Sequence, residues 1–184
     1  ELHRRIMDEV IHPTVRGLAE EGMPYLGFLY AGLMIDTQGN PRVLEYNCRF
    51  GDPETQPILM RMRSDLAGLC QAALDGELDR FRIEWDPRFA LGVVMVADGY
   101  PGEYPRGDKI SGLQDIMSDN IKVFHAGTRQ ESGQTVTDGG RVLCVTALGA
   151  TVDAAQQAAY GTVSTIHWPG AGWRPDIGWR ALNR

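Results

Sequence analysis

Three polar side chains spaced two residues apart are the part of the sequence best suited to chemistry. Glu45, Asn47 and Arg49 lie in residues 44–56, where the chain reads as a β-strand, and residues two apart in a strand share a face. Carboxylate and amide oxygens suit Mg²⁺, and a neighbouring arginine suits bidentate binding of carboxylate or phosphate. The spacing predicts a face that binds anions with a metal ion. The alternative is a solvent-exposed strand face without function.

The residues between these three point to the opposite side of the predicted strand. They are Leu44, Tyr46, Cys48 and Phe50, and their apolar character predicts that this second face is packed.

The next residues combine features that start a helix. Gly51 is flexible, Asp52 is a good N-cap and Pro53 suits the first helical position, and the N–H groups of a helix N-terminus attract anions. Pro57 lies one turn further on and cannot donate a backbone hydrogen bond. We therefore expect either a helix that kinks at Pro57 or one that begins only near residues 55–57.

A β-hairpin is expected to hold the three polar residues. Residues 25–35 read as a strand, residues 36–40 as a turn and residues 42–45 as the returning strand. Upstream, apolar residues recur at helical spacing over residues 2–21, with Pro13 as an expected kink. A helix already in progress at residue 2, in a chain without an initiator Met, leads us to expect a fragment of a longer protein.

One further helix is predicted before a region of short strands. Ser64 and Asp65 begin it, Gly76 ends it, and its apolar stripe is predicted to be core; the stripe consists of Leu66, Leu69, Cys70, Ala73 and Leu74. From about residue 81 the chain predicts short strands separated by turns, at residues 89–97, 122–125, 135–137 and 141–148. A helix with Thr151 as its N-cap interrupts them.

We therefore expect a fold of the α/β and α+β classes, with one domain over residues 1–80 and a small β-rich domain over residues 81–184. The length of 184 residues, 43% of them hydrophobic, is enough for such an arrangement.

Composition restricts the partners and the compartment. No apolar run reaches the roughly 18 residues that span a bilayer, and the N-terminus lacks a signal-peptide core. A net charge of −6 without a Lys/Arg block argues against nucleic acid. Cys48, Cys70 and Cys144 fit neither a disulfide framework nor a zinc site. These features predict a soluble cytoplasmic protein that binds neither membrane nor nucleic acid.

A known combination of motifs is present in residues 27–36, 45–56, 123–128, 139–143 and 176–181. Together these segments resemble the glycinamide ribonucleotide synthetases, also called phosphoribosylamine-glycine ligases, of the ATP-grasp superfamily. The Arg-Phe-Gly-Asp-Pro-Glu run at 49–54 is specific to this family, whereas Glu-x-Asn alone indicates only an ATP-grasp fold. The resemblance covers essentially the whole chain. It implies the C-terminal part of an ATP-grasp domain followed by a small C-terminal domain, without the family's N-terminal part and its nucleotide-gripping lysine region.

The resemblance also implies a reaction of de novo purine biosynthesis. ATP phosphorylates the glycine carboxylate to glycyl phosphate, and the amine of 5-phosphoribosylamine then displaces phosphate. Glu45 and Asn47 match the family's ligands for Mg²⁺ or Mn²⁺ with ATP. Arg49 matches a catalytic residue that holds the glycine carboxylate and then the acyl phosphate, next to Gly51 and Asp52. Such chemistry needs positioning and charge neutralisation more than covalent help from the protein.

Residues near the C-terminus are candidates for the second substrate. Arg174, Asp176 and Arg180 could bind the ribose phosphate, because an anionic phosphate needs basic partners; alternatively, they pair within the Trp-rich tail. Many ATP-grasp enzymes also carry an acidic metal ligand on the preceding strand. This chain has Gly32 near that position, so the number of metal ions stays open.

Two other functions remain open at this point: a non-catalytic binding or carrier-like module, and a fragment of another ATP-grasp enzyme such as a carboxylase subunit. As part of a ligase, the chain would have ATP, glycine, 5-phosphoribosylamine and the N-terminal part of the same polypeptide as partners. Alone, we expect it to be inactive, to bind neither Mg²⁺ nor Mg-ATP appreciably, and to expose apolar surface on the N-terminal helix and hairpin.

Overall fold

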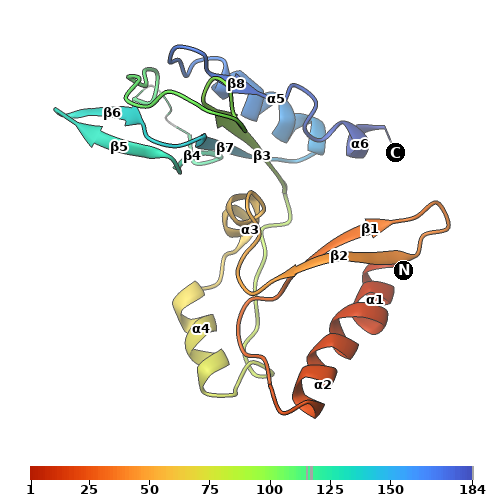
Figure 1. The fold of residues 1–184 in the computed structure, drawn as a ribbon. Coiled ribbons are helices and arrows are strands. Elements are labelled where there is room, and N and C mark those ends of the chain that lie inside the picture. Colours follow the sequence, from red (N-terminus) through yellow and green to blue (C-terminus); the bar gives the residue numbers. More distant parts are fainter. Residues whose placement is uncertain (115, 117, 184) are drawn as a thin grey trace. The chain divides into compact units, whose positions relative to one another are not determined.

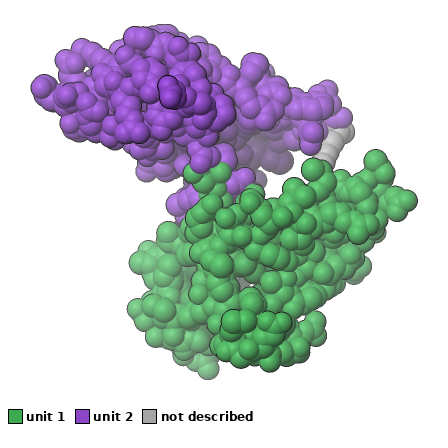
Figure 2. Space-filling view, viewed as in Figure 1, with its two compact units in different colours: residues 1–52, 64–83 green, residues 53–63, 84–184 purple. Residues whose placement is uncertain are grey.

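The computed structural model describes residues 1–114, 116 and 118–183, and the chain divides into two compact units (Figure 1, Figure 2). Unit 1 comprises Glu1–Asp52 and Ser64–Ile83, and unit 2 comprises Pro53–Arg63 and Glu84–Arg184. The domain boundary after residue 80 stays a prediction. The prediction did not include one feature of this division: the segment Pro53–Arg63 belongs to unit 2, together with the second half of the chain.

Unit 1 begins with a helical segment whose middle is a π-helix. α1 (Leu2–Ile6), η1 (Met7–Ile11) and α2 (His12–Glu20) follow one another without a break. Pro13 has no N–H to donate to the preceding turn, and the backbone N–H of His12 bonds to the oxygen of Met7, five residues back. The kink predicted at Pro13 therefore takes the form of a π-helical turn just before it.

The predicted hairpin is formed by β1 (Tyr30–Ile35) and β2 (Pro41–Asn47), which pair antiparallel. Asp36 closes the turn, since its Oδ1 accepts the N–H groups of Gln38 and Asn40, each at 2.9 Å. The hydrogen bonds from Asn40 are the main cause of a lowered Asp36 pKa. The first strand begins only at Tyr30, later than the predicted start at residue 25.

A β-bulge interrupts β2 next to the predicted site. Gly32 lies opposite Glu45 and Leu33 lies opposite Val43, so Leu44 has no cross-strand partner. The pairing is regular again from Glu45 to the end of the strand.

The prediction of a packed face on this strand is wrong for three of its four residues. Leu44 is 65% exposed and has no cross-strand partner. Tyr46 and Cys48 are also exposed, although the Tyr46 hydroxyl forms a 2.7 Å hydrogen bond with a threonine of α2. Phe50 is half-buried and stacks on Phe28 with ring centroids 3.9 Å apart.

α4 (Leu66–Leu74) starts as predicted, with Asp65 as N-cap accepting the N–H groups of Ala67 and Gly68. Its apolar stripe is not core, however. No residue of α4 is buried, and Leu74 is 70% exposed. A stripe becomes core only when a second layer covers it, and unit 1 leaves this one along an open pocket.

Unit 2 is built on an antiparallel sheet of order β4-β7-β3-β8. β3 (Phe89–Val96), β4 (Ile121–His125) and β7 (Arg141–Gly149) lie within one residue of their predicted bounds, whereas β8 (Gly172–Trp173) was not predicted. α5 (Val152–Val163) begins as expected at Thr151, whose Oγ1 accepts the N–H of Ala154 at 3.1 Å. A separate hairpin of β5 (Thr128–Glu131) and β6 (Gln134–Thr137) and a short α6 (Trp179–Leu182) complete the unit.

The core of unit 2 lies between α5 and one face of the sheet. Leu91, Val93 and Met95 of β3 belong to it, together with alternate residues of β7 and small residues of α5. α3 (Thr55–Arg61) packs on the other face, where a Cβ on Gly92 would lie 3.3 Å from Cγ of Pro57. Gly92 therefore leaves the space that this proline occupies.

α3 begins at the later of the two predicted points. Its N-cap residue is Glu54, so Pro57 is the third helical residue. The N–H groups of the first turn have no partner within the helix, and a proline there forfeits no hydrogen bond. Asp52 is consequently not the N-cap.

A buried carboxylate connects the segment after α3 with the segment before β3. Asp86 is 4% exposed; Arg88 donates to both of its carboxylate oxygens at 2.9 and 2.8 Å, and Nη2 of Arg63 donates to Oδ2 at 3.0 Å. The hydrogen bonds from Arg88, with that from Arg63, hold the pKa of Asp86 far below its ordinary value.

Within the part of the chain that the structure describes, no helix is both long and apolar enough to cross a membrane.

Candidate functional site

The end of β2 places two oxygen-bearing side chains on one face. Glu45 lies opposite Gly32 and Asn47 lies opposite Tyr30 in the regular part of the hairpin, and alternate residues of a strand point to the same side. A Cβ at position 32 would lie only 3.0 Å from Cγ of Glu45. The glycine therefore leaves the space in which the Glu45 side chain lies.

Arg49 lies two residues beyond the strand and turns back toward it. Its Nη2 donates to Oδ1 of Asn47 at 3.2 Å, and its Nη1 donates to the carbonyl oxygen of Phe50 at 2.7 Å. Phe50 is held in turn by its stack on Phe28. These contacts use two of the five N–H donors of a guanidinium, so the Arg49 side chain is both oriented and able to bind an external anion.

The ligand chemistry at this face is that of oxygen atoms. Among residues 1–114, 116 and 118–183, no group of three or more His, Cys, Asp or Glu could hold a metal ion by itself. Glu45 and Asn47 instead offer one carboxylate and one amide oxygen, the kind of partial set that Mg²⁺ accepts when substrate phosphates complete its shell.

Gly51 and Asp52 connect this face to the following helix. Gly51 is buried and Asp52 is exposed, and α3 starts only at Thr55. The role of the two residues in anion binding stays a prediction, and it does not include the first turn of α3.

The structure brings together the three candidates near the C-terminus. Arg174, Asp176 and Arg180 line one cavity of about 400 Å³ in unit 2. Arg174 binds both oxygens of Asp176, at 2.9 and 2.7 Å, and holds the pKa of Asp176 below its ordinary value. The guanidinium of Arg180 lies 5.5 Å from the ring centre of Trp179. Arg174 and Asp176 therefore pair within the tail, which was the alternative to phosphate binding, and this pair lies at the wall of a cavity.

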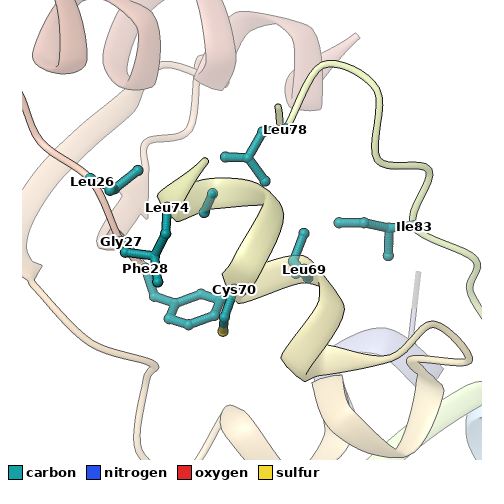
Figure 3. Close-up of a pocket in the computed structure, with 9 residues that line it drawn as sticks. Leu26, Gly27, Phe28, Leu69, Cys70, Leu74, Leu78 and Ile83 are labelled. Carbon is teal, nitrogen blue, oxygen red and sulfur yellow. The ribbon is translucent and has the colours of Figure 1, made fainter. Parts of the chain in front are cut away.

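A pocket of a different kind lies in unit 1 (Figure 3). It measures about 410 Å³, and its wall includes Leu69, Cys70 and Leu74 of α4 together with Leu26 and Phe28. Its lining residues carry no charged group. This pocket therefore offers apolar contact rather than catalytic chemistry.

Sequence reasoning gave no role to Arg141, which lines a further cavity of unit 2 together with Tyr100 and Trp173. The resemblance includes residues 139–143 but assigns no function to Arg141. The available signal was a charged residue directly after two glycines at the start of a strand.

Comparison with known proteins identifies both parts of the chain. Residues 1–55 match the family model described as "Phosphoribosylglycinamide synthetase, ATP-grasp (A) domain", and residues 90–180 match "Phosphoribosylglycinamide synthetase, C domain". Relatives named phosphoribosylamine–glycine ligase from Vibrio parahaemolyticus and Escherichia coli O157:H7 are each 60% identical over the whole chain. The chain spans 43% of the length of these relatives.

Solved structures agree with this assignment. The crystal structure of a phosphoribosylamine–glycine ligase from Thermotoga maritima matches with a TM-score of 0.79 and 34% identity, covering 95% of this chain and 42% of that one. A biotin carboxylase domain of 2-oxoglutarate carboxylase from Hydrogenobacter thermophilus matches with a TM-score of 0.61 at 17% identity, covering 84% of this chain and 34% of that one, which shows a shared fold. The predicted fold class is confirmed. The chain belongs to the phosphoribosylglycinamide synthetase family.

Proposed function

We propose that this chain is part of an ATP-dependent ligase of purine biosynthesis that joins glycine to 5-phosphoribosylamine, giving glycinamide ribonucleotide, ADP and phosphate. The observation that carries the proposal is the hydrogen bond from Arg49 to Asn47, which sets a guanidinium beside the oxygen-bearing face of Glu45. The names of the 60% identical relatives support the same reaction. Because the chain spans 43% of those relatives, the proposal concerns a full-length ligase that contains this sequence.

Glu45 and Asn47 fit a divalent cation, Mg²⁺ or Mn²⁺. The space left by Gly32 lets the Glu45 carboxylate lie along the hairpin, and the Asn47 amide oxygen has a second lone pair besides the one that Arg49 uses. Bound there, the cation would neutralise charge on the ATP phosphates.

Arg49 performs the central task of the chain in the proposed reaction. Its guanidinium holds the glycine carboxylate while one carboxylate oxygen attacks the γ-phosphorus of ATP and ADP leaves. The amine nitrogen of phosphoribosylamine then attacks the carbonyl carbon of glycyl phosphate, phosphate leaves, and the nitrogen loses a proton. Arg49 stays beside the acyl phosphate and stabilises the negative charge that passes to the leaving phosphate. Gly51 and Asp52 follow directly and complete the surroundings of the glycine.

Unit 2 supplies the binding of the second substrate. Arg174 and Arg180 bind the ribose phosphate, and Asp176 orients Arg174 through its two-pronged pair. The substrates are therefore ATP, glycine and 5-phosphoribosylamine, and the partner of the chain is the remaining part of the same ligase. The enzyme would act in the cytoplasm.

The two alternative functions receive less support. A carrier-like module gives no reason for Arg49 and Asn47 to meet beside Glu45. A carboxylase fragment would rest on a 17% identical neighbour that shares only the fold, whereas both family models name the same synthetase.

The replacement Arg49→Lys in a full-length ligase with this sequence tests the proposal. An ammonium cannot reproduce a planar two-pronged hold, so we expect kcat/KM for glycine to fall roughly tenfold or more, while circular dichroism stays unchanged. Arg42→Lys is the matched control, because Arg42 lies on the same strand with a 70% exposed side chain. Glycine kinetics equal to wild type in Arg49→Lys would contradict the proposed role.

A further inference from the structure

A cavity of unit 2 lies on the sheet face opposite α5. It measures about 500 Å³, which is within the range of small-molecule sites. Gly92, Val94 and Val96, alternate residues of β3, form its floor. The remaining lining consists of Pro53, Tyr100, Arg141, Trp173, Arg174 and Ile177. The cavity thus combines an apolar floor with two aromatic rings and two guanidinium groups.

A β-bulge directs Arg141 toward this cavity. β7 pairs Leu143 with Met95 and Arg141 with Val96, so Val142 is an extra residue in β7. Regular alternation would place Val142 on the cavity face and Arg141 on the face that α5 covers. With the bulge, Val142 is fully buried, and Arg141 lies opposite Val96, a residue of the cavity floor. Bulges next to functional sites commonly re-aim a side chain in this way.

The glycine before Arg141 fixes the neighbouring aromatic ring. A Cβ on Gly140 would collide with the rings of Tyr100 and Tyr104, so only glycine lets both rings lie against this backbone. The Gly140 oxygen also accepts the N–H of Ala97 at 2.9 Å. Tyr100 is therefore held at the cavity by the same segment that presents Arg141.

Arg174 reaches the cavity from the loop after β8, and its backbone is anchored to α5. The Tyr160 hydroxyl donates to the carbonyl oxygen of Arg174 at 2.6 Å and accepts the N–H of Ile177 at 3.0 Å. Asp176 holds the guanidinium itself. A group fixed before its ligand arrives loses less entropy on binding.

We propose that this cavity binds the ribose 5-phosphate portion of the amine substrate, with Arg141 and Arg174 on the phosphate and Tyr100 and Trp173 against the sugar. Guanidinium groups match phosphate with paired hydrogen bonds, and aromatic rings pack against the apolar face of a sugar. The inference rests on the proposed function and changes one of its residues. Arg141 takes the place of Arg180, which does not line this cavity, beside Arg174. The nucleotide belongs to the polar face of β2 in that proposal, which leaves a monophosphate ester for this cavity.

Calorimetric titration of the full-length ligase with ribose 5-phosphate tests the cavity directly. Arg141→Met should weaken binding by roughly tenfold or more, because a hydrogen-bonded charge is lost, and Arg141→Lys should weaken it less. Arg129→Met is the matched control, since Arg129 pairs with Glu131 and Asp138 and does not line the cavity. Affinity in Arg141→Met equal to wild type would overturn the proposal.

Two further measurements make the result independent of folding defects. Val94→Phe fills the cavity floor while both arginines remain, and it should also weaken ribose 5-phosphate binding. In steady-state kinetics, the KM for phosphoribosylamine should rise in Arg141→Lys and Val94→Phe, with the KM values for ATP and glycine unchanged. A rise confined to the KM for ATP would mean that the cavity takes the nucleotide instead, and it would overturn the assignment.

Failure of the proposed function gives a different result. A wild-type ligase that hydrolyses ATP without joining glycine to the amine would refute the function, whereas ribose 5-phosphate binding that depends on Arg141 would still support a sugar-phosphate site.

Discussion

The two units of this chain differ in how far each buries its own apolar residues. In unit 2, Val93, Met95, Leu143 and Val145 are fully buried between the sheet and α5. In unit 1, Val10 is the only buried hydrophobic residue among those that the structure describes. Unit 1 nevertheless has well-formed helices and an antiparallel hairpin.

The comparison shows that a sequence can form helices, turns and hairpins without also forming a hydrophobic core. Turn chemistry at Asp36 and the N-cap at Asp65 form within a few residues, and they need no distant layer. Burial of Leu44, Leu74 or Met34 needs one, and these side chains are 65%, 70% and 54% exposed. The relatives are more than twice as long as this chain, and exposed apolar side chains such as these are typical of surfaces that contact other protein.

The largest expected effect separates the cores of the two units. Leu143→Ala removes a fully buried side chain from unit 2 and should lower the free energy of unfolding of that unit by about 2–5 kcal/mol. Leu44→Ala in unit 1 should change stability by less than about 0.5 kcal/mol, because Leu44 is mostly exposed already. Denaturant titration measures both. Comparable losses would mean that unit 1 has a core that the burial pattern does not reveal.

Fluorescence can follow unit 2 alone in this experiment. All four tryptophans of the sequence, Trp85, Trp168, Trp173 and Trp179, belong to unit 2. Far-UV circular dichroism reports on both units, so a difference between the two signals identifies the unit that unfolds.

The sequence predicts those parts of the structure that depend on neighbouring residues. The hairpin, α4, α5 and three of the four strands of the main sheet follow from alternation, caps and turns. The shared face of Glu45 and Asn47 follows from their spacing, and Arg49 joins them through Asn47. Each of these features is set by residues that lie close together along the chain.

The parts that the sequence does not predict depend on pairing between strands. Two bulges, at Leu44 and at Val142, shift the register of strand pairing, and alternation alone cannot reveal an extra residue in a ladder. The first bulge leaves Leu44, which was predicted as packed, without a cross-strand partner. The second directs Arg141 to a cavity, so this residue was missed. Similarly, Asp86 meets Arg63 across 23 residues, a contact that only the tertiary fold creates.

The second effect is a loss of stability at low pH, and it is expected in unit 2 alone. Asp86 has a pKa below its ordinary value because Arg88 and Arg63 bind the carboxylate. The unfolded chain therefore takes up this proton at higher pH than the folded chain does. The stabilisation is complete above the ordinary carboxyl pKa of about 4 and is lost as the pH falls below it.

Asp86→Asn tests this dependence. The stability difference from wild type, measured by tryptophan fluorescence in urea, should be constant between pH 5 and pH 7 and should shrink below about pH 4. Asp79→Asn is the control, an exposed aspartate of unit 1. A difference between wild type and Asp86→Asn that stays unchanged down to pH 3 would show that the carboxylate charge of Asp86 does not stabilise unit 2.

The smallest effect on stability is expected at the apolar pocket of unit 1, where association is the quantity that changes. Leu74→Glu places a charge on a 70% exposed position of its wall, so the free energy of unfolding should change by less than about 0.5 kcal/mol. The 184-residue chain should nevertheless self-associate less, because exposed apolar patches favour contact between copies. Sedimentation velocity over a range of concentrations measures this, with Glu77→Gln as a nearby control on an exposed side chain. If Leu74→Glu self-associates as strongly as wild type, the pocket is not the surface through which copies of the chain associate. The hairpin, with Met34 and Leu44 exposed, would then be the part of unit 1 that most needs a covering layer.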